Sequence, residues 1–293
     1  MKKLLGCLLL GIISFSLHAQ EISMSFPKFS GKSYDFIIFQ GSEQKTIYQG
    51  VIPEGGKFTL SVPEEYKGYE GMSRWLITGT KEGGGLDMYI PGHDFSVSCE
   101  EDKPSEENII YGNNNGNGAL NKLYKEGEGI VLRYDLMLRA TNLFNNNDKN
   151  YKVFVNEYNN QRKAYDNFQK ELSQRGDYIS DFVRIVNITQ GIGTKLYDNE
   201  KYKGENIAGY IVNDMNFEYL YTSGHWWSVL NGWVGIHTRV LKNPNRFKED
   251  FKRISKKLKS ETMQKDFRNR VESFLKEEGH ADYIRLIAST SQL

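Results

Sequence analysis

The spacing of apolar residues changes once along the chain, at the Asn- and Gly-rich cluster Gly112–Gly118, and this change constrains the fold more than any other feature. Before the cluster, short β-prone runs are separated by turn residues. After it, apolar residues recur every three or four positions, as on one face of a helix. Strand and helix patterns do not alternate, so a parallel sheet is not expected. The sequence therefore predicts an α+β protein, with residues 20–111 as an antiparallel β-sandwich and residues 112–293 as an all-α helical domain.

Five runs in the first part have the composition and alternation of strands. They are Tyr34–Phe39, Lys57–Val62, Arg74–Gly79, Leu86–Ile90 and Phe95–Cys99. Turn clusters such as "PEGG" and "PGHD" separate them, and the spacing fits about seven strands. Within the last run, Phe95, Val97 and Cys99 share one face, which predicts a buried and inert Cys99 thiol.

Helical periodicity in the second part predicts five to seven helices between Ala119 and Ala288. The clearest amphipathic stripe is Phe247, Phe251, Ile254 and Leu258, surrounded by Lys and Arg residues that predict a solvated face. The cluster Gly112–Gly118 is interpreted as a turn and linker, because its glycines fit neither the dinucleotide-binding pattern nor the P-loop spacing.

The stretch "TSGHWWSVLNGWVGIHTR" (222–239) holds three of the four tryptophans. With Ser223 as N-cap, a helix would place Trp226, Trp233 and His237 on one stripe, and Trp227 would widen it. Such an apolar stripe favours burial in the core. The alternative is a stacking platform for sugars. Its candidate ligand-binding residues are Trp226, Trp227, Trp233 and His225.

No catalytic, cofactor-binding or metal-binding motif is recognised. His225 and His237 are twelve residues apart in the sequence, which places them about 120° apart around a helix, so they do not share a face. Neither a His-Glu-x-x-His pattern, a paired Cys, nor a Gly-x-Ser-x-Gly elbow is present. These observations favour a non-enzymatic protein without a cofactor or metal.

The first nineteen residues have the three parts of a secretory signal: two lysines, an apolar run from Leu4 to Leu17, and Ala19 before Gln20. We therefore expect export to the periplasm or cell envelope, with cleavage near Ala19–Gln20. Removing this segment lowers the Lys and Arg count from 38 to 36 against 37 Asp and Glu, a balance that gives no reason to expect nucleic acid as a partner. A membrane span is not predicted in the mature chain.

The order of segments resembles the region that precedes the thioredoxin module in envelope TlpA-like (AhpC/TSA-type thioredoxin-like) proteins. The matching residues are "GKFTLSVPEEYKGYEGM" (56–72), "LDMYIPGHDFSVSCEEDKPSEENIIYGNNNGNGALNKLY" (86–124) and "DMNFEYLYTSGHWW" (214–227). In that family a thioredoxin fold with Cys-x-x-Cys follows, and this chain lacks such a segment. The resemblance implies an envelope location and a redox neighbourhood, and it carries over no catalytic residue.

Three functions follow as expectations. The first is a non-enzymatic envelope protein that acts as a binding or scaffolding module, through the loops of the β part or the seam between the two parts. The second is an accessory partner, or a truncated half, of a thioredoxin-like thiol–disulfide oxidoreductase. The third is a carbohydrate-binding protein that holds a glycan on its tryptophans.

Overall fold

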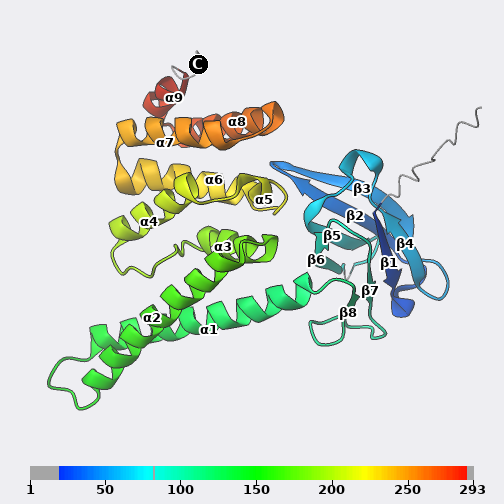
Figure 1. The fold of residues 1–293 in the computed structure, drawn as a ribbon, viewed down its shortest axis with the longest axis horizontal. Helices are drawn as coiled ribbons and strands as arrows, with labels where there is room; N and C mark the ends of the chain where they lie inside the picture. The colour runs from blue at the N-terminus through cyan, green and yellow to red at the C-terminus, as the bar shows by residue number, and fades with distance from the viewer. Residues whose placement is uncertain (1–19, 82, 289–293) are drawn as a thin grey trace, which may run out of the picture.

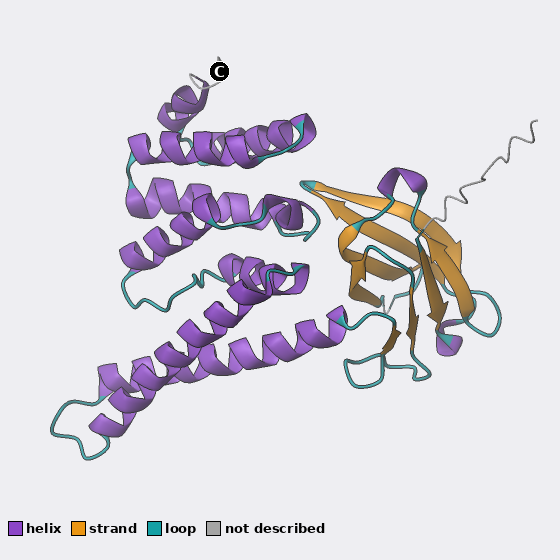
Figure 2. Ribbon diagram, viewed as in Figure 1, coloured by secondary structure: helices purple, strands orange, loops and turns teal. Residues whose placement is uncertain are grey.

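The computed structural model describes residues 20–81 and 83–288. Within these residues the chain is mixed α and β, as predicted, with eight strands followed by nine α-helices (Figures 1 and 2). The predicted signal peptide, residues 1–19, lies outside the described residues. The predicted domain limits stay a prediction, although the last strand ends at Gly112 and the first α-helix begins at Gly116.

The strands form two four-stranded sheets, in the orders β4-β1-β7-β8 and β3-β2-β5-β6. Their bounds are β1 (Glu21–Ser25), β2 (Ser33–Gln40), β3 (Glu43–Val51), β4 (Lys57–Ser61), β5 (Glu70–Thr78), β6 (Gly85–Pro91), β7 (Phe95–Ser98) and β8 (Ile110–Gly112). All five predicted runs are strands. Short 3₁₀ turns at Pro27–Phe29 and Glu64–Tyr66 lie between them.

One strand pair corrects the expectation of purely antiparallel sheets: β1 and β7 run parallel. The connection from β1 to β7 runs from residue 26 to residue 94, and a connection of this length permits parallel pairing. The strand β3 was missed because its side chains are mostly polar and exposed. The strands β1 and β8 are not among the five runs identified by alternation, and they have only five and three residues.

Side chains from both sheets meet in one buried cluster. Trp75 of β5 lies at its centre, with its ring centroid 4.6 Å from that of Phe26. Phe95, Val97 and Cys99 are buried in the same cluster, which confirms that they share the inner face.

The α-helices are α1 (Gly116–Leu143), α2 (Tyr151–Arg175), α3 (Tyr178–Thr189), α4 (Glu200–Asn213), α5 (Phe217–Tyr221), α6 (Trp226–Gly235), α7 (Pro244–Lys257), α8 (Glu261–Glu277) and α9 (Ala281–Ala288). A π-helical segment, Ile236–Leu241, continues α6. The described residues thus hold more helices than the five to seven predicted, because short helices such as α5 give little periodic signal. Phe247, Phe251, Ile254 and Leu258 are all buried, which confirms the stripe on α7.

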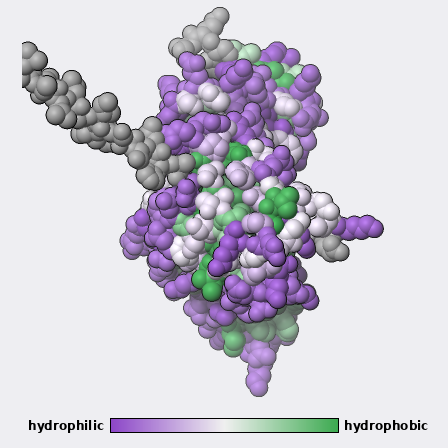
Figure 3. Space-filling model, turned by 90° about the vertical axis from the view of Figure 1, so that its right-hand side faces the viewer, coloured by the Kyte–Doolittle hydropathy of each residue, from purple (hydrophilic) through white to green (hydrophobic). Residues whose placement is uncertain are grey.

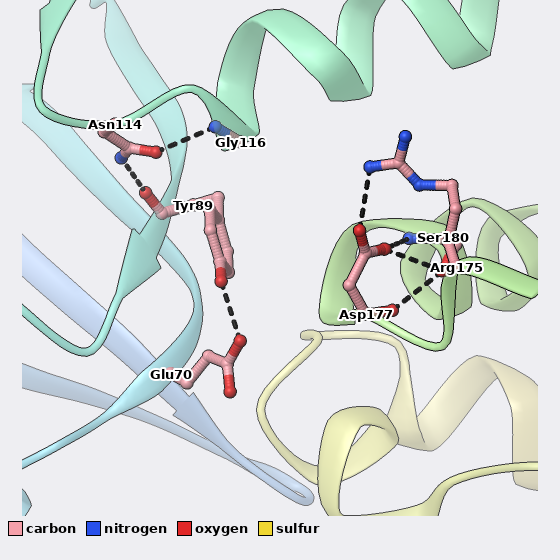
Figure 4. A network of polar contacts seen from close by, with 7 residues as sticks. All are labelled: Glu70, Tyr89, Asn114, Gly116, Arg175, Asp177 and Ser180. Atoms are coloured by element: carbon pink, nitrogen blue, oxygen red, sulfur yellow. Dashed lines mark hydrogen bonds and ion pairs between the residues drawn. The ribbon is translucent and has the colours of Figure 1, made fainter.

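The cluster Gly112–Gly118 contains the turn that connects β8 to α1, and it also makes contacts that the sequence did not predict. The Asn117 carboxamide oxygen accepts from the backbone N–H of Tyr89 at 2.9 Å. Asn114 Nδ2 donates to the Tyr89 carbonyl at 2.8 Å, as Figure 4 shows. These bonds satisfy the free edge of β6, which pairs only with β5. Gly116 lies so close to the Tyr89 ring that a Cβ would approach a ring carbon to 2.3 Å. The cluster therefore fastens the start of α1 to the sheet.

A second set of bonds joins the two parts of the chain. The Thr222 carbonyl, just after α5, accepts from the Met72 N–H at 2.9 Å and from the hydroxyls of Tyr69 and Tyr178 at 3.2 and 3.1 Å. At the turn between β2 and β3, Ser42 donates from its backbone and its hydroxyl to the Asp266 carboxylate of α8. These contacts fix the orientation of the helices relative to the sheets.

Candidate functional site

The structure separates the three tryptophans of the 222–239 stretch. Trp226 and Trp233 have no exposed surface, whereas 51% of Trp227 is exposed. Trp226 packs edge-on against Tyr221, and Trp233 stacks on Phe247 at 5.1 Å. Core packing is therefore correct for the first two rings. The prediction that Trp227 widens the buried stripe is wrong.

The predicted start of this helix also needs correction. The helix α6 begins at Trp226 and its N-cap position is His225. Ser223 precedes Gly224, whose φ of +76° is incompatible with a right-handed helix, so the Ser223 hydroxyl cannot cap α6. It accepts instead from the His225 N–H at 3.0 Å and donates to the Leu220 carbonyl.

The four candidate ligand-binding residues do not form one site. Trp227 lies at the surface, where the Arg270 guanidinium stacks 4.2 Å from its ring centroid. Arg270 Nε donates to Asn231 at 2.9 Å, and burial lowers the pKa of Arg270. His225 is half-buried, with its ring 5.5 Å from that of Phe182. Burial lowers the pKa of His225, and the nearby Asp87 carboxylate opposes this shift.

A buried histidine lies close to a carboxylate at the end of the same segment. His237 has no exposed surface, and its Nε2 is 3.3 Å from a carboxylate oxygen of Asp250. Arg246 approaches the same oxygen at 3.5 Å. The His237 ring, within the π-helical segment, packs edge-on against Trp233 and Phe247 at 5.0 and 5.4 Å, so it is part of the helical core. Within residues 20–81 and 83–288, no group of three or more His, Cys, Asp or Glu residues could hold a metal ion.

The face shown in Figure 3 carries hydrophobic residues only in separate small areas among hydrophilic ones. On the helical part, three neighbouring hollows lie around the loop between α3 and α4, residues 190–199. Because they share lining residues, we call them together the loop-190 groove. The first two hollows share Val131, Gln190 and Ile192, and the second and third share Gln190, Gly191, Glu200 and Lys203. Their volumes are about 330, 310 and 270 Å³.

The three hollows differ in chemistry. The first lies between α1 and α3 and is mainly apolar, with side chains from Leu123, Val131, Val183 and Ile192. The second is charged, with Asp135, Lys195, Asp198, Glu200 and Lys203. The third lies between α4 and α6, where Ile188, Ile207, Ile236 and Val240 line it together with Glu200 and Lys203, which it shares with the second hollow. Apolar residues thus line both ends of the groove, and charged residues line its centre and the border with the third hollow.

The loop that forms the groove is held rigidly. The Tyr165 hydroxyl donates to the Gly193 carbonyl at 2.8 Å. The hydroxyls of Tyr134 and Tyr158 both donate to the Asp198 carboxylate. The Tyr134 hydroxyl is buried and bonded to this anion, and both effects raise its pKa, so it stays a proton donor. A loop fixed in this way presents its binding groups without an ordering cost.

Gly232 of α6 keeps the third hollow open. It lies in the hollow's lining, and a Cβ at this position would meet no atom within 4 Å. The groove was missed from the sequence because its lining comes from α1, α3, the loop, α4, α6 and the π-helical segment. The one available signal was the Gly-containing run "QGIGTKLYDN" between two helical stretches, since a conformationally fixed loop commonly carries function.

Comparisons with protein-family models, with curated proteins and with solved structures each give no match. Among the described residues, no helix combines the length and the hydrophobicity required to cross a bilayer.

Proposed function

We propose that this chain is a non-enzymatic, exported binding module whose loop-190 groove takes a peptide segment of a partner protein. The observation that carries the proposal is the order of the three hollows. We consider a peptide that has one apolar side chain on each side of a polar stretch. Its apolar side chains would contact the apolar residues at the two ends of the groove, and its polar stretch would contact the charged residues between them. Recognition grooves for peptides commonly combine apolar pockets with a few fixed polar groups.

The resemblance to TlpA-like proteins suggests where such a partner would come from. We propose a thioredoxin-like envelope protein as the source of the peptide, because the resembling region accompanies a thioredoxin module in that family. Export through the N-terminal signal would bring the chain to the same compartment. We also infer that the two sheets pack face to face as a β-sandwich, a proposal supported by the buried cluster that both sheets share.

The peptide proposal is tested by selecting from a random-peptide library on the purified protein. Gly232→Leu supplies the comparison, because Gly232 lines the third hollow and a Cβ at this position would meet no atom within 4 Å. Gly118→Leu is the matched control, since Gly118 is also helical and also has open space around it. We expect peptides with two separated apolar residues to enrich on the wild type and on the control but not on Gly232→Leu. Enrichment of the same peptides on all three proteins would contradict the proposal.

The exposed Trp227 favours a second candidate function, the binding of a glycan. One face of its indole carries the Arg270 guanidinium, and Asn231 and Glu277 flank that cation at 2.9 and 3.7 Å. An exposed aromatic ring beside hydrogen-bonding groups is suited to stacking a sugar ring. Titration of a glycan panel followed by tryptophan fluorescence tests this. A change that disappears in Trp227→Ala supports the glycan site, and an unchanged spectrum across the panel removes it.

A further inference from the structure

A stripe of exposed leucines runs along α1. Leu132, Leu136 and Leu143 are 60, 61 and 82% exposed. On a helix with about 100° per residue these three positions lie within about 40° of each other, so they share one face, on which Arg139 lies between Leu136 and Leu143. Three large leucines on one exposed helix face are unusual for a surface that stays in water.

The stripe lies on an arm of the molecule. The helices α1 and α2 form a hairpin that projects from the body at the lower left of Figure 1. The two helices pack through Tyr134 and Tyr158, whose rings stack at 5.4 Å, and through Phe144 and Phe154 near the tip. The leucine stripe faces away from these contacts. Within residues 20–81 and 83–288, no other element covers it.

The stripe has the spacing of an antiparallel helix pair. Positions 129, 132, 136, 139 and 143 follow the alternating four- and three-residue steps of a coiled-coil seam, with Gly129 and Arg139 at the two non-leucine positions. If a second α1 lies antiparallel in register, Leu132 packs beside Leu143 of the second copy. Leu136 then packs on the methylene stem of Arg139 of the second copy. A two-fold axis makes each of these contacts twice.

The charges beside the stripe fit the same register. Asp135 and Arg139 are exposed and have no ion-pair partner among the described residues. In the antiparallel register, Asp135 of each copy lies near the Arg139 guanidinium of the other. The pairing therefore gives two symmetric ion pairs at the edge of the apolar seam, which set the direction and register of the helices.

We propose that the exposed face of α1 is a dimerisation surface whose occupant is the α1 of a second copy of this chain. The overlap involves the outer half of each arm, so the two bodies lie at opposite ends of the dimer. Leu132 and Asp135 also line the first and second hollows of the loop-190 groove, whereas Leu136 and Leu143 line none of the three. The inference goes beyond the proposed function, and variants at Leu136 and Leu143 test it separately from peptide binding.

Light scattering coupled to size-exclusion chromatography tests the surface over a range of protein concentrations. We expect the wild type to shift toward the dimer mass as its concentration rises, and Leu136→Glu and Leu143→Glu to stay monomeric. Both positions are exposed, so circular dichroism should show unchanged folding. A Leu143→Glu protein that loses dimerisation but retains any peptide binding would separate this surface from the groove.

Charge reversal tests the register. Asp135→Arg places two arginines opposite each other, and Arg139→Asp places two carboxylates opposite each other, so each variant alone should be monomeric. Mixing the two variants restores both ion pairs, and we expect a heterodimer in the mixture only. A wild type that stays monomeric at all concentrations would overturn the proposal. A dimer that persists in the Leu→Glu variants, or a mixture that stays monomeric, would also overturn it.

Discussion

Trp226 and Trp227 are neighbours in the chain, yet the first has no exposed surface and the second is 51% exposed. Consecutive residues on a helix point about 100° apart, so one ring enters the core while the other turns outward. Trp226 meets Tyr221 in the core, and Trp227 meets Arg270 at the surface. Substitutions at adjacent positions can therefore distinguish stability from surface binding.

We expect Trp233→Ala and Trp226→Ala each to lower the free energy of unfolding by about 3–5 kcal/mol, because each leaves a large cavity among buried rings. Trp227→Ala is the matched control and should cost less than about 1 kcal/mol, since its ring is half exposed. Urea unfolding followed by circular dichroism measures all three. Similar losses for Trp227→Ala and Trp233→Ala would contradict this arrangement of the helix.

A substitution at Gly71 tests the contact between the β part and the helical part. A Cβ on Gly71 of β5 would lie 2.5 Å from the Cβ of Thr222, so even an alanine side chain would push the two parts away from each other. We expect Gly71→Ala to lower the free energy of unfolding by about 1–3 kcal/mol. Gly118→Ala, which has open space, should be neutral or slightly stabilising. Thermal melts of both variants check this, and equal melting temperatures would contradict the close approach.

His225 should make stability depend on pH. Its folded pKa lies below the ordinary value of 6.5, mainly because burial disfavours the charged ring. The unfolded chain therefore binds its proton first as pH falls, so stability is full above about 6.5 and declines toward the folded pKa. We expect His225→Gln to reduce this decline. Urea unfolding of both proteins between pH 5 and 8 measures how the free energy of unfolding changes with pH. The same pH dependence in wild type and His225→Gln would contradict this prediction.

We expect the Cys99 thiol to be unreactive in the folded protein. Its thiol is buried and lies 3.4 Å from the Asn108 carboxamide oxygen. We expect a thiol-specific chromogenic reagent to react with Cys99 only after denaturation, and Cys99→Ser to retain peptide binding. Rapid reaction in the native state would instead assign this residue to thiol exchange.

The order of the secondary structure could be predicted because local patterns carry it. The alternation of Phe95, Val97 and Cys99 and the stripe from Phe247 to Leu258 each indicate one buried face, and both faces are buried. The parallel β1–β7 pair could not be predicted in this way, because strand direction across a long connection depends on packing between distant segments. The role of Asn114 and Asn117 was hidden for the same reason, since their bonding partner, Tyr89, is distant in sequence.

The loop-190 groove was beyond sequence reasoning because no single segment contains it. Val131, Ile192, Ile207 and Gly232 come from three helices and a loop, and only the fold brings them together. The tryptophan-rich stretch drew attention because it is compositionally unusual, yet two of its three rings serve the core. The unusual tryptophan content of this stretch therefore indicated a buried core and not a binding site. The candidate site consists of common residue types that the fold brings together.

The most direct test of the central claim is the affinity of a library-selected peptide for the wild type and for Gly232→Leu, measured by fluorescence anisotropy. If the peptide occupies the loop-190 groove, the variant should bind at least about tenfold more weakly, while Gly118→Leu binds as the wild type does. Equal affinity for wild type and Gly232→Leu, with both proteins equally stable, would show that the groove is not the binding site.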